Sequence, residues 1–305
     1  MKKNRYENID THIKPNTVKD ILRWQKERRR KKKDMSFQVP FTNKTEEQFL
    51  QTNRSLSTIT WIGHSTFLIQ MNGRNILFDP VWAKRMGFQK RLSPPGIPID
   101  ELPAIDLVLI SHSHYDHLHD ASIKKLKGNP MFVVPIGLAK WFHRKGIHKT
   151  IECAWWEEHT VTGLKLAFVP AQHWTKRTLT DTNCSHWGGW VLQDSEQTIY
   201  FAGDSGYFNG FEAIGKTYDI DYCLMPIGAY EPEWFMSSQH VTPEDAVKAF
   251  IDTNAKTMIP MHYGTFMLAD DTPKEALDRL LAEWEKRKLD DNNLKVMKVG
   301  ETISI

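Results

Sequence analysis

Short apolar runs, separated by turn-forming residues, recur along most of this chain and predict a protein rich in β-strands. In the first half these runs predict strands at 58–61, 66–71, 76–78 and 107–110, with the turn Asn72-Gly73 between the second and the third. A further run predicts a strand at 131–134. In the second half the same pattern predicts strands at 164–169, 190–193, 198–202, 222–225 and 257–260.

Helical periodicity is found in fewer segments. It predicts helices over 121–127 and 137–145, a helix that begins after Thr242, and a last helix over 273–288. Thr242 suits the N-cap position and Pro243 the first helical position. The predicted apolar stripe of the last helix consists of Leu277, Leu280, Leu281 and Trp284.

The order of these elements favours two sheets packed face to face with helices outside, because each strand-rich half ends in helices. A stretch rich in Pro and Gly, at 87–103, is predicted to form a long surface loop. With 305 residues and 40% hydrophobic content, the chain can bury the core of one large domain. We expect a basic N-terminal arm and lead-in over 1–57 and a catalytic domain over 58–305.

Cysteine usage and the lack of long apolar runs indicate the cellular compartment in which the protein is expected. The three cysteines, Cys153, Cys184 and Cys223, are odd in number and widely spaced, so the sequence predicts packing roles in a reducing compartment. The first residues lack the apolar core of a signal peptide, and no run approaches 18 apolar residues. The sequence therefore predicts a soluble, cytoplasmic protein and leaves its oligomeric state open.

Positive charge is concentrated at the N-terminus. Residues 1–33 hold 13 Lys/Arg and 4 Asp/Glu, while the whole chain has a net charge of +3, so the rest is acidic. The basic run 28–33 is either a solvated arm or a peripheral tether to anionic membrane, where each basic residue contributes about 1 kcal/mol. In the second interpretation Ile21, Leu22 and Trp24 supply an apolar foot. An acidic body argues against nucleic-acid binding.

The run His112-Ser113-His114-Tyr115-Asp116-His117 places four metal-ligating side chains directly after a predicted buried strand. In an extended segment, residues two apart point to the same side, so His112 and His114 can reach one cation. A helical turn that begins near Asp116 would direct Asp116 and His117 toward a second position nearby. The alternative is a solvated loop rich in histidine.

Three more candidate ligands each follow a predicted strand: His173, Asp204 and His262. Taken alone, such a residue is usually a cap or turn residue. Together with the first cluster they give five His and two Asp, which suffice for two divalent ions with a position open for water. Imidazole and carboxylate favour two Zn²⁺ over magnesium, with iron or manganese as alternatives.

This pattern of ligands resembles that of the metallo-β-lactamase superfamily of dinuclear zinc hydrolases. The resemblance implies an α+β fold, the αβ/βα four-layer sandwich with two mixed β-sheets flanked by helices. From Trp61 to the C-terminus the chain further resembles the N-acylphosphatidylethanolamine-hydrolysing phospholipase D family. The similar blocks are 61–66, 170–174, 176–179, 201–207, 226–232 and 261–266. Ser65 and Tyr263 depart from that family, where Ala and Trp are expected.

The resemblance also implies roles for the candidate ligands. One zinc is assigned to His112, His114 and His173, the other to Asp116, His117 and His262, with Asp204 between them. A metal-bound hydroxide is then expected to attack the phosphodiester of N-acylphosphatidylethanolamine-like lipids, with Asp116 or Asp204 moving the proton. No serine nucleophile is needed, and Ser65 and Ser205 lack the spacing of a nucleophile elbow.

Candidate residues for substrate binding or support of the metals are His64, Tyr230 and His240. His64 is expected to support the metal site, and His240 to reach a phosphate oxygen or the leaving group. Tyr230, with Trp234, Phe235 and Met236, is a candidate wall for acyl chains. Lys176 and Arg177 either meet an anionic substrate or are solvated. The competing functions are a zinc-dependent lactone or ester hydrolase, a small-molecule phosphodiesterase, and a non-catalytic binding protein.

Overall fold

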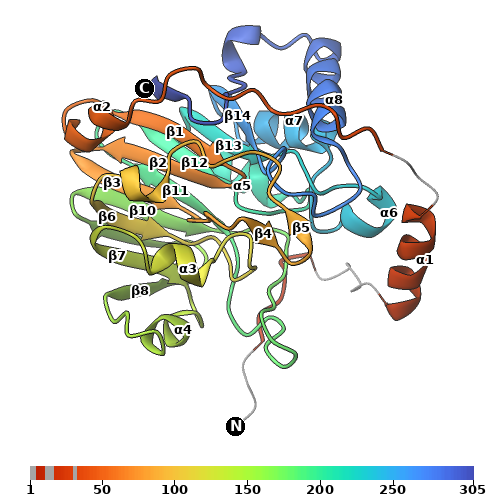
Figure 1. Cartoon of the computed structure of the whole chain (residues 1–305), viewed down its shortest axis with the longest axis horizontal. Helices are drawn as coiled ribbons and strands as arrows, with labels where there is room; N and C mark the ends of the chain where they lie inside the picture. Colours follow the sequence, from red (N-terminus) through yellow and green to blue (C-terminus); the bar gives the residue numbers. More distant parts are fainter. Residues whose placement is uncertain (1–4, 11–16, 30–32) are drawn as a thin grey trace.

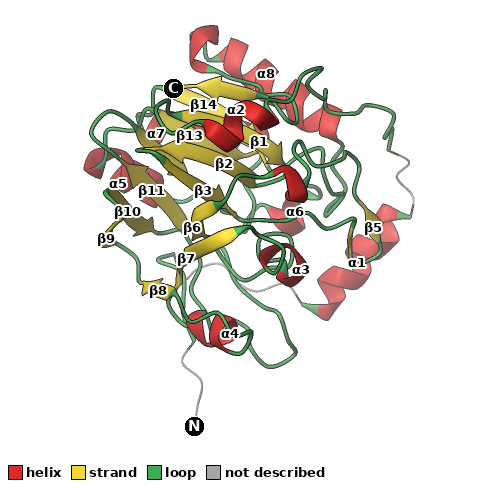
Figure 2. Cartoon of the chain, turned by 60° about the vertical axis from the view of Figure 1, so that its left-hand side comes forward, coloured by secondary structure: helices red, strands yellow, loops and turns green. Residues whose placement is uncertain are grey.

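Two β-sheets lie face to face, and helices cover their outer faces (Figures 1 and 2). The structure is a computed structural model and describes residues 5–10, 17–29 and 33–305. Within the described residues no helix is long and apolar enough to cross a membrane. The α+β sandwich predicted from the sequence is confirmed.

The first sheet has seven strands and is mixed. Neighbouring strands are antiparallel from β15 to β3 and parallel from β3 to β8. In spatial order they are β15 (Thr302–Ser304), β1 (Thr58–Gly63), β2 (Thr66–Met71), β3 (Arg74–Phe78), β6 (Ile105–Leu109), β7 (Gly128–Pro135) and β8 (Thr150–Cys153).

The second sheet has six strands and is also mixed. Its order is β14 (Thr257–Met261), β13 (Tyr222–Pro226), β12 (Thr198–Phe201), β11 (Gly189–Gln193), β10 (Leu164–Val169) and β9 (Glu157–Val161). The first three are parallel and the others antiparallel. A small hairpin, β4 (Arg85–Met86) and β5 (Gln89–Lys90), stands apart from both sheets.

Helices pack on both outer faces. On the first sheet these are α2 (Glu47–Thr52), α3 (Asp120–Ile123) and α4 (Ala139–His143), and on the second α5 (Gly210–Thr217), α7 (Pro243–Asp252) and α8 (Pro273–Lys286). The other helical segments are α1 (Val18–Arg28), α6 (Glu233–Met236) and the 3₁₀ turns η1 (Ile99–Glu101) and η2 (Asp291–Asn293).

Strands buried on both faces explain why continuous apolar runs marked this fold so clearly. In β3, Ile76 and Phe78 face the second sheet, whereas Leu77 between them faces the outer helices. Phe78 stacks on Phe201 of the opposite sheet, with ring centroids 4.6 Å apart. The alternation therefore divides the apolar side chains between the central core and the outer layer.

Most predicted elements agree with the structure, and the N-cap of α7 is confirmed by the Thr242 side chain, which accepts a hydrogen bond from Asp245 N. The predicted stripe of α8 is wrong at Leu281, which is 44% exposed because Ala276, Leu280 and Trp284 form the buried face. The 87–103 stretch is not only surface loop, since it contains β5 and η1 and buries apolar side chains. Strands β8 and β9 and helix α5 were not predicted.

The N-terminal residues that the structure describes pack on the body. The Trp24 indole of α1 donates a hydrogen bond to Asp270 Oδ2 at 2.6 Å and lies 5.0 Å from the Phe235 ring. Trp24 thus faces inward and is not part of an exposed foot, whereas Ile21 and Leu22 are exposed as expected. Residues 30–32 of the predicted basic tether lie outside the described residues.

Candidate metal centre

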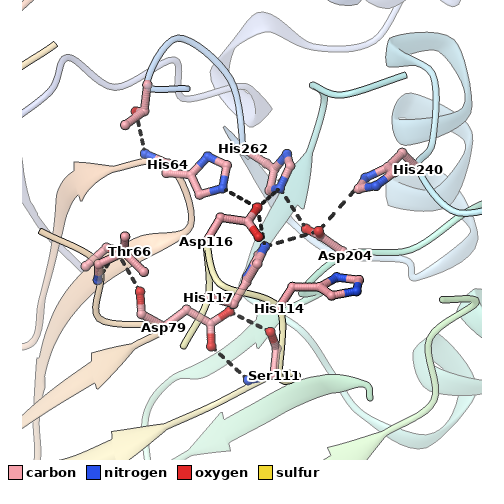
Figure 3. A network of polar contacts seen from close by, with 12 residues as sticks. His64, Thr66, Asp79, Ser111, His114, Asp116, His117, Asp204, His240 and His262 are labelled. Atoms are coloured by element: carbon pink, nitrogen blue, oxygen red, sulfur yellow. Dashed lines mark hydrogen bonds and ion pairs between the residues drawn. The ribbon is translucent and has the colours of Figure 1, made fainter. Parts of the chain in front are cut away.

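The predicted ligands meet at one edge of the sandwich, because each follows a strand that ends there. The His112–His117 loop follows β6, and His173, Asp204 and His262 come after β10, β12 and β14. Figure 3 shows side chains from the loops after β6, β12 and β14 converging on one point. The structure therefore brings all seven predicted ligands together, while their role as ligands stays a prediction.

Three imidazoles form the first group. His114 Nδ1 lies 3.0 Å from His112 Nε2 and 3.2 Å from His173 Nε2. Ligand atoms of a tetrahedral zinc, each about 2.1 Å from the ion, are roughly 3.4 Å apart. The spacing of the three nitrogen atoms thus suits one cation of that size.

The second group consists of one carboxylate and two imidazoles. Asp116 Oδ2 lies 3.4 Å from His117 Nε2 and 3.5 Å from His262 Nε2. These distances also match the edges of a small coordination polyhedron. A second cation fits between these three side chains.

Asp204 stands between the two groups. Its Oδ2 lies 3.1 Å from His117 Nε2 and 3.8 Å from His112 Nε2, and its Oδ1 lies 3.1 Å from His262 Nε2. One carboxylate thus touches both sets of ligands, and Figure 3 shows its contacts with His117 and His262. This is the position that a residue bridging two ions requires.

Buried acceptor atoms test whether metal ions fit this site. Asp204 Oδ1, His117 Nε2 and His262 Nε2 are buried and, among the described residues, lack a hydrogen-bond partner. Buried polar atoms are nearly always paired in folded proteins. Because these atoms converge on one another, a cation placed among them would give each of them a partner, so the donor set fits divalent cations.

The pKa values give part of the site the charge state that metal binding needs. Burial lowers the pKa of His112 and of His173 well below the usual value, so both imidazoles are neutral. Burial raises the pKa of Asp204, but His117 and His262 lower it further, so the carboxylate stays ionised. Burial lowers the pKa of His262, yet Asp204 and Asp116 raise it to about 9, so a bound cation would replace a proton there.

Asp79 supports the second group from behind. Its Oδ2 lies 2.6 Å from His117 Nδ1, and its carboxylate accepts hydrogen bonds from Ser111 N at 2.8 Å and Ser111 Oγ at 2.5 Å. The sequence analysis missed Asp79. It follows β3 directly, as the other ligands follow their strands, and this placement was the available signal.

His64 reaches the site through a bulge at the end of β1, where the register shifts between Trp61 and Gly63. Gly63 has a φ of 121°, and a Cβ there would lie 2.9 Å from the Arg91 guanidinium, so glycine is required. His64 Nε2 then lies 3.0 Å from Asp116 Oδ2. The structure therefore places His64 where a supporting partner of the metal site should be.

The other predicted substrate residues differ in their placement. His240 Nδ1 lies 3.9 Å from Asp204 Oδ2, at the edge of the site (Figure 3). Tyr230 instead lies in the main core, fully buried, with the Arg279 guanidinium 4.7 Å above its ring. A direct contact between Tyr230 and substrate therefore has no support from its placement.

Two residues hold the metal-site loops from outside. Arg177 Nη1 donates to Ser113 O at 2.7 Å and Leu118 O at 2.8 Å, so Arg177 faces the loop itself, neither solvent nor an anion. Asn8 binds the main chain of His173 on both sides, accepting from its N at 3.1 Å and donating to its O at 2.9 Å. No sequence pattern indicated this role of Asn8, because its partner is 165 residues away.

Comparison with known proteins identifies the family. Residues 74–263 match the family model described as a Beta-lactamase superfamily domain. The chain belongs to the metallo-β-lactamase superfamily. Among solved members, the metallo hydrolase Igni18 from Ignicoccus hospitalis is 25% identical, with a TM-score of 0.64 over 82% of this chain and 99% of that one.

Curated relatives within the superfamily are enzymes by name. A Caenorhabditis elegans protein called N-acyl-phosphatidylethanolamine-hydrolyzing phospholipase D 1 is 34% identical, over 88% of this chain and 81% of its own. A Bacillus cereus protein called UPF0173 metal-dependent hydrolase is 30% identical, over 81% of this chain and 99% of its own. This member of the metallo-β-lactamase superfamily is therefore a metal-dependent hydrolase.

Proposed function

We propose that the protein is a two-zinc phosphodiesterase of phospholipase D type that acts on N-acylphosphatidylethanolamine-like lipids. The observation that carries the proposal is the similarity to the worm phospholipase D, 34% identical over 88% of this chain. The arrangement of the candidate site supports it, because Asp204 touches both groups of ligands. Two cations bound there would supply an activated water and neutralise the charge of a phosphodiester.

The protein residues around the ions have distinct tasks in this proposal. Asp116 stays ionised because its pKa lies well below the usual range, where His117, His262 and His64 outweigh the effect of burial. His64 orients Asp116 through their 3.0 Å contact. Burial lowers the pKa of His240 to about 4, so its neutral ring can donate an N–H to a phosphate oxygen or the leaving oxygen.

Water is the nucleophile in this proposal, and the two nearby serines agree with that. Ser205 Oγ donates to Gly206 O at 2.7 Å and accepts from Gln172 N at 2.9 Å, so this hydroxyl holds the main chain. Ser65 is fully buried beside β2. Neither serine is placed as an attacking group.

One observation favours a smaller substrate as a second candidate. The aromatic side chains of α6, expected to line an acyl groove, are partly covered by α1: Trp24 packs on Phe235, and the Arg23 guanidinium lies 4.0 Å above Trp234, which stays 38% exposed. With this cover in place, a lactone, another ester or a small phosphodiester needs less room than a diacyl lipid. In that case the same site would polarise a carbonyl.

Hydrolysis of defined substrates separates the candidates. Zinc-loaded protein is incubated with vesicles of N-acylphosphatidylethanolamine, bis(p-nitrophenyl) phosphate or an acyl-homoserine lactone, with metal content measured in each sample. The proposal expects N-acylethanolamine release that is lost in Asp204→Asn and kept in Asp278→Asn, a matched change on exposed α8. Lactone hydrolysis with no N-acylethanolamine release, with metals bound, would contradict it.

A further inference from the structure

We propose that the edge of the molecule that carries the metal site docks on an anionic lipid bilayer, with three apolar projections inserted between the headgroups. The projections are Phe88, Leu179 and the outward row of α1. The proposal describes how the proposed lipid hydrolase would reach its substrate, and in this respect it rests on the proposed function. Binding to a bilayer is nevertheless measurable without any hydrolysis.

Two loop tips expose large apolar side chains almost completely. Phe88, at the turn of the β4–β5 hairpin, is 99% exposed, and Leu179, in the loop after His173, is 93% exposed. Single exposed apolar residues are ordinary on protein surfaces. The two matter here because both loops are fastened to the metal site.

The hairpin is joined to the site through the two residues that follow its last strand. Leu92 N donates to Thr265 O at 2.8 Å, and the Arg91 guanidinium lies 5.2 Å from the Phe266 ring. The Phe266 ring in turn meets His64 edge-on, with centroids 5.4 Å apart. Phe88 therefore projects from an element that borders the site.

The loop with Leu179 is fastened to the metal loop itself. Tyr115 Oη donates to Arg177 O at 2.7 Å, and Arg177 binds the carbonyl of Ser113 in return. Leu179 follows two residues later. Its tip thus leaves the molecule beside the His112–His117 loop.

Helix α1 supplies the third projection. Val18, Ile21 and Leu22 are spaced i, i+3, i+4 and are exposed, while Trp24 and Arg28 on another face both bind Asp270. The helix thus lies along the body with an apolar row outward, as in helices that bind membrane surfaces. Figures 1 and 2 both place α1 on the same side of the molecule as β5.

The charge around these projections selects the partner. No Asp or Glu occurs between residues 84 and 99, whereas Lys84, Arg85 and Lys90 flank Phe88 and are exposed. On α1, Lys19 and Lys26 stand beside the apolar row. Basic residues around apolar tips suit anionic lipid, and two copies of this edge facing each other would repel.

Flotation on vesicles tests the proposal with the full chain. Wild-type protein is mixed with vesicles of phosphatidylcholine alone or with 30% phosphatidylglycerol, at low and at high salt. We expect binding to the anionic vesicles that weakens as salt rises. Phe88→Ser and Leu179→Ser should each weaken it by roughly 10-fold, since each removes an inserted apolar side chain.

Leu56→Ser is the matched control, because Leu56 is 53% exposed on the turn before β1 and should bind like the wild type. No flotation with anionic vesicles at low salt would overturn the proposal. The proposal would also be overturned if Phe88→Ser and Leu179→Ser bound the vesicles as tightly as Leu56→Ser does. A dimer in solution that Phe88→Ser abolishes would overturn it as well. Flotation without N-acylphosphatidylethanolamine hydrolysis would support the docking edge while refuting the lipid substrate.

Discussion

Asp79→Asn should weaken metal binding at the second group without removing any ligand. Asp79 and His117 are both fully buried, and the carboxylate faces donors on every side that the structure describes: Ser111 N, Ser111 Oγ and His117 Nδ1. Asparagine has almost the same shape, but one oxygen becomes an NH₂ donor. If its carbonyl keeps Ser111 N, the NH₂ faces His117 Nδ1.

Two donors then oppose each other, and the imidazole has two ways to respond. It either leaves a buried N–H unpaired, or moves its proton to Nε2, which then cannot bind a cation. An unpaired buried group costs about 1–3 kcal/mol. This free energy corresponds to about 5- to 150-fold in metal affinity, a range that includes the 10- to 100-fold loss typical when such a partner of a ligand is changed.

Competition with a chelator measures this change. We titrate three proteins with zinc against the same indicator: the wild type, Asp79→Asn and the matched control Asp106→Asn. The Asp106 carboxylate lies away from the site and accepts a hydrogen bond of 2.8 Å from Asn75 N. We expect one of two ions to bind 10- to 100-fold more weakly in Asp79→Asn only. Unchanged affinity for both ions would refute the role given to Asp79.

Three further substitutions test the supports of the site and the effect of pH. Arg177→Ala removes both of these hydrogen bonds, so we expect a loss of about 1–3 kcal/mol in the free energy of unfolding in urea; a change below about 0.5 kcal/mol would show that these bonds matter little. Asn8→Ala removes both hydrogen bonds to the His173 main chain and should lower the zinc affinity of the first group about 10-fold in the same chelator assay. Equal zinc affinity would show that Asn8 does not help to position His173. Burial raises the pKa of Asp271 from 3.8 to about 6, so the folded state binds its proton more tightly and loses stability as pH rises from 4 to 6. Asp271→Asn should remove up to about 3 kcal/mol of that pH dependence in urea unfolding, and parallel wild-type and variant curves would contradict this.

The sequence predicted the strands well because both of their faces are buried, so mostly apolar runs such as 66–71 and 164–169 marked them closely. The seven candidate ligands could be found for a related reason. They stand directly after those runs, and the ends of strands at one edge bring their side chains together. The short strands β8 and β9 were missed because they mix polar and apolar residues without a long run.

Residues that act through distant partners left only weak signals in the sequence, or none. An aspartate after a strand resembles a turn residue until His117 is seen beside it, as with Asp79. Asn8 depends on a partner 165 residues away, and the inward face of Trp24 on one 246 residues away. Leu281 fits a helical apolar stripe by spacing, but the angle at which α8 lies on the body turns it outward.

The central claim is that seven side chains hold two metal ions, and counting the ions tests it most directly. Protein saturated with zinc and freed of excess metal is measured by inductively coupled plasma mass spectrometry, with His173→Ala and His262→Ala beside the wild type. The account predicts two ions in the wild type and one weakened ion in each variant, a different one each time. One ion or none in saturated wild-type protein would contradict it.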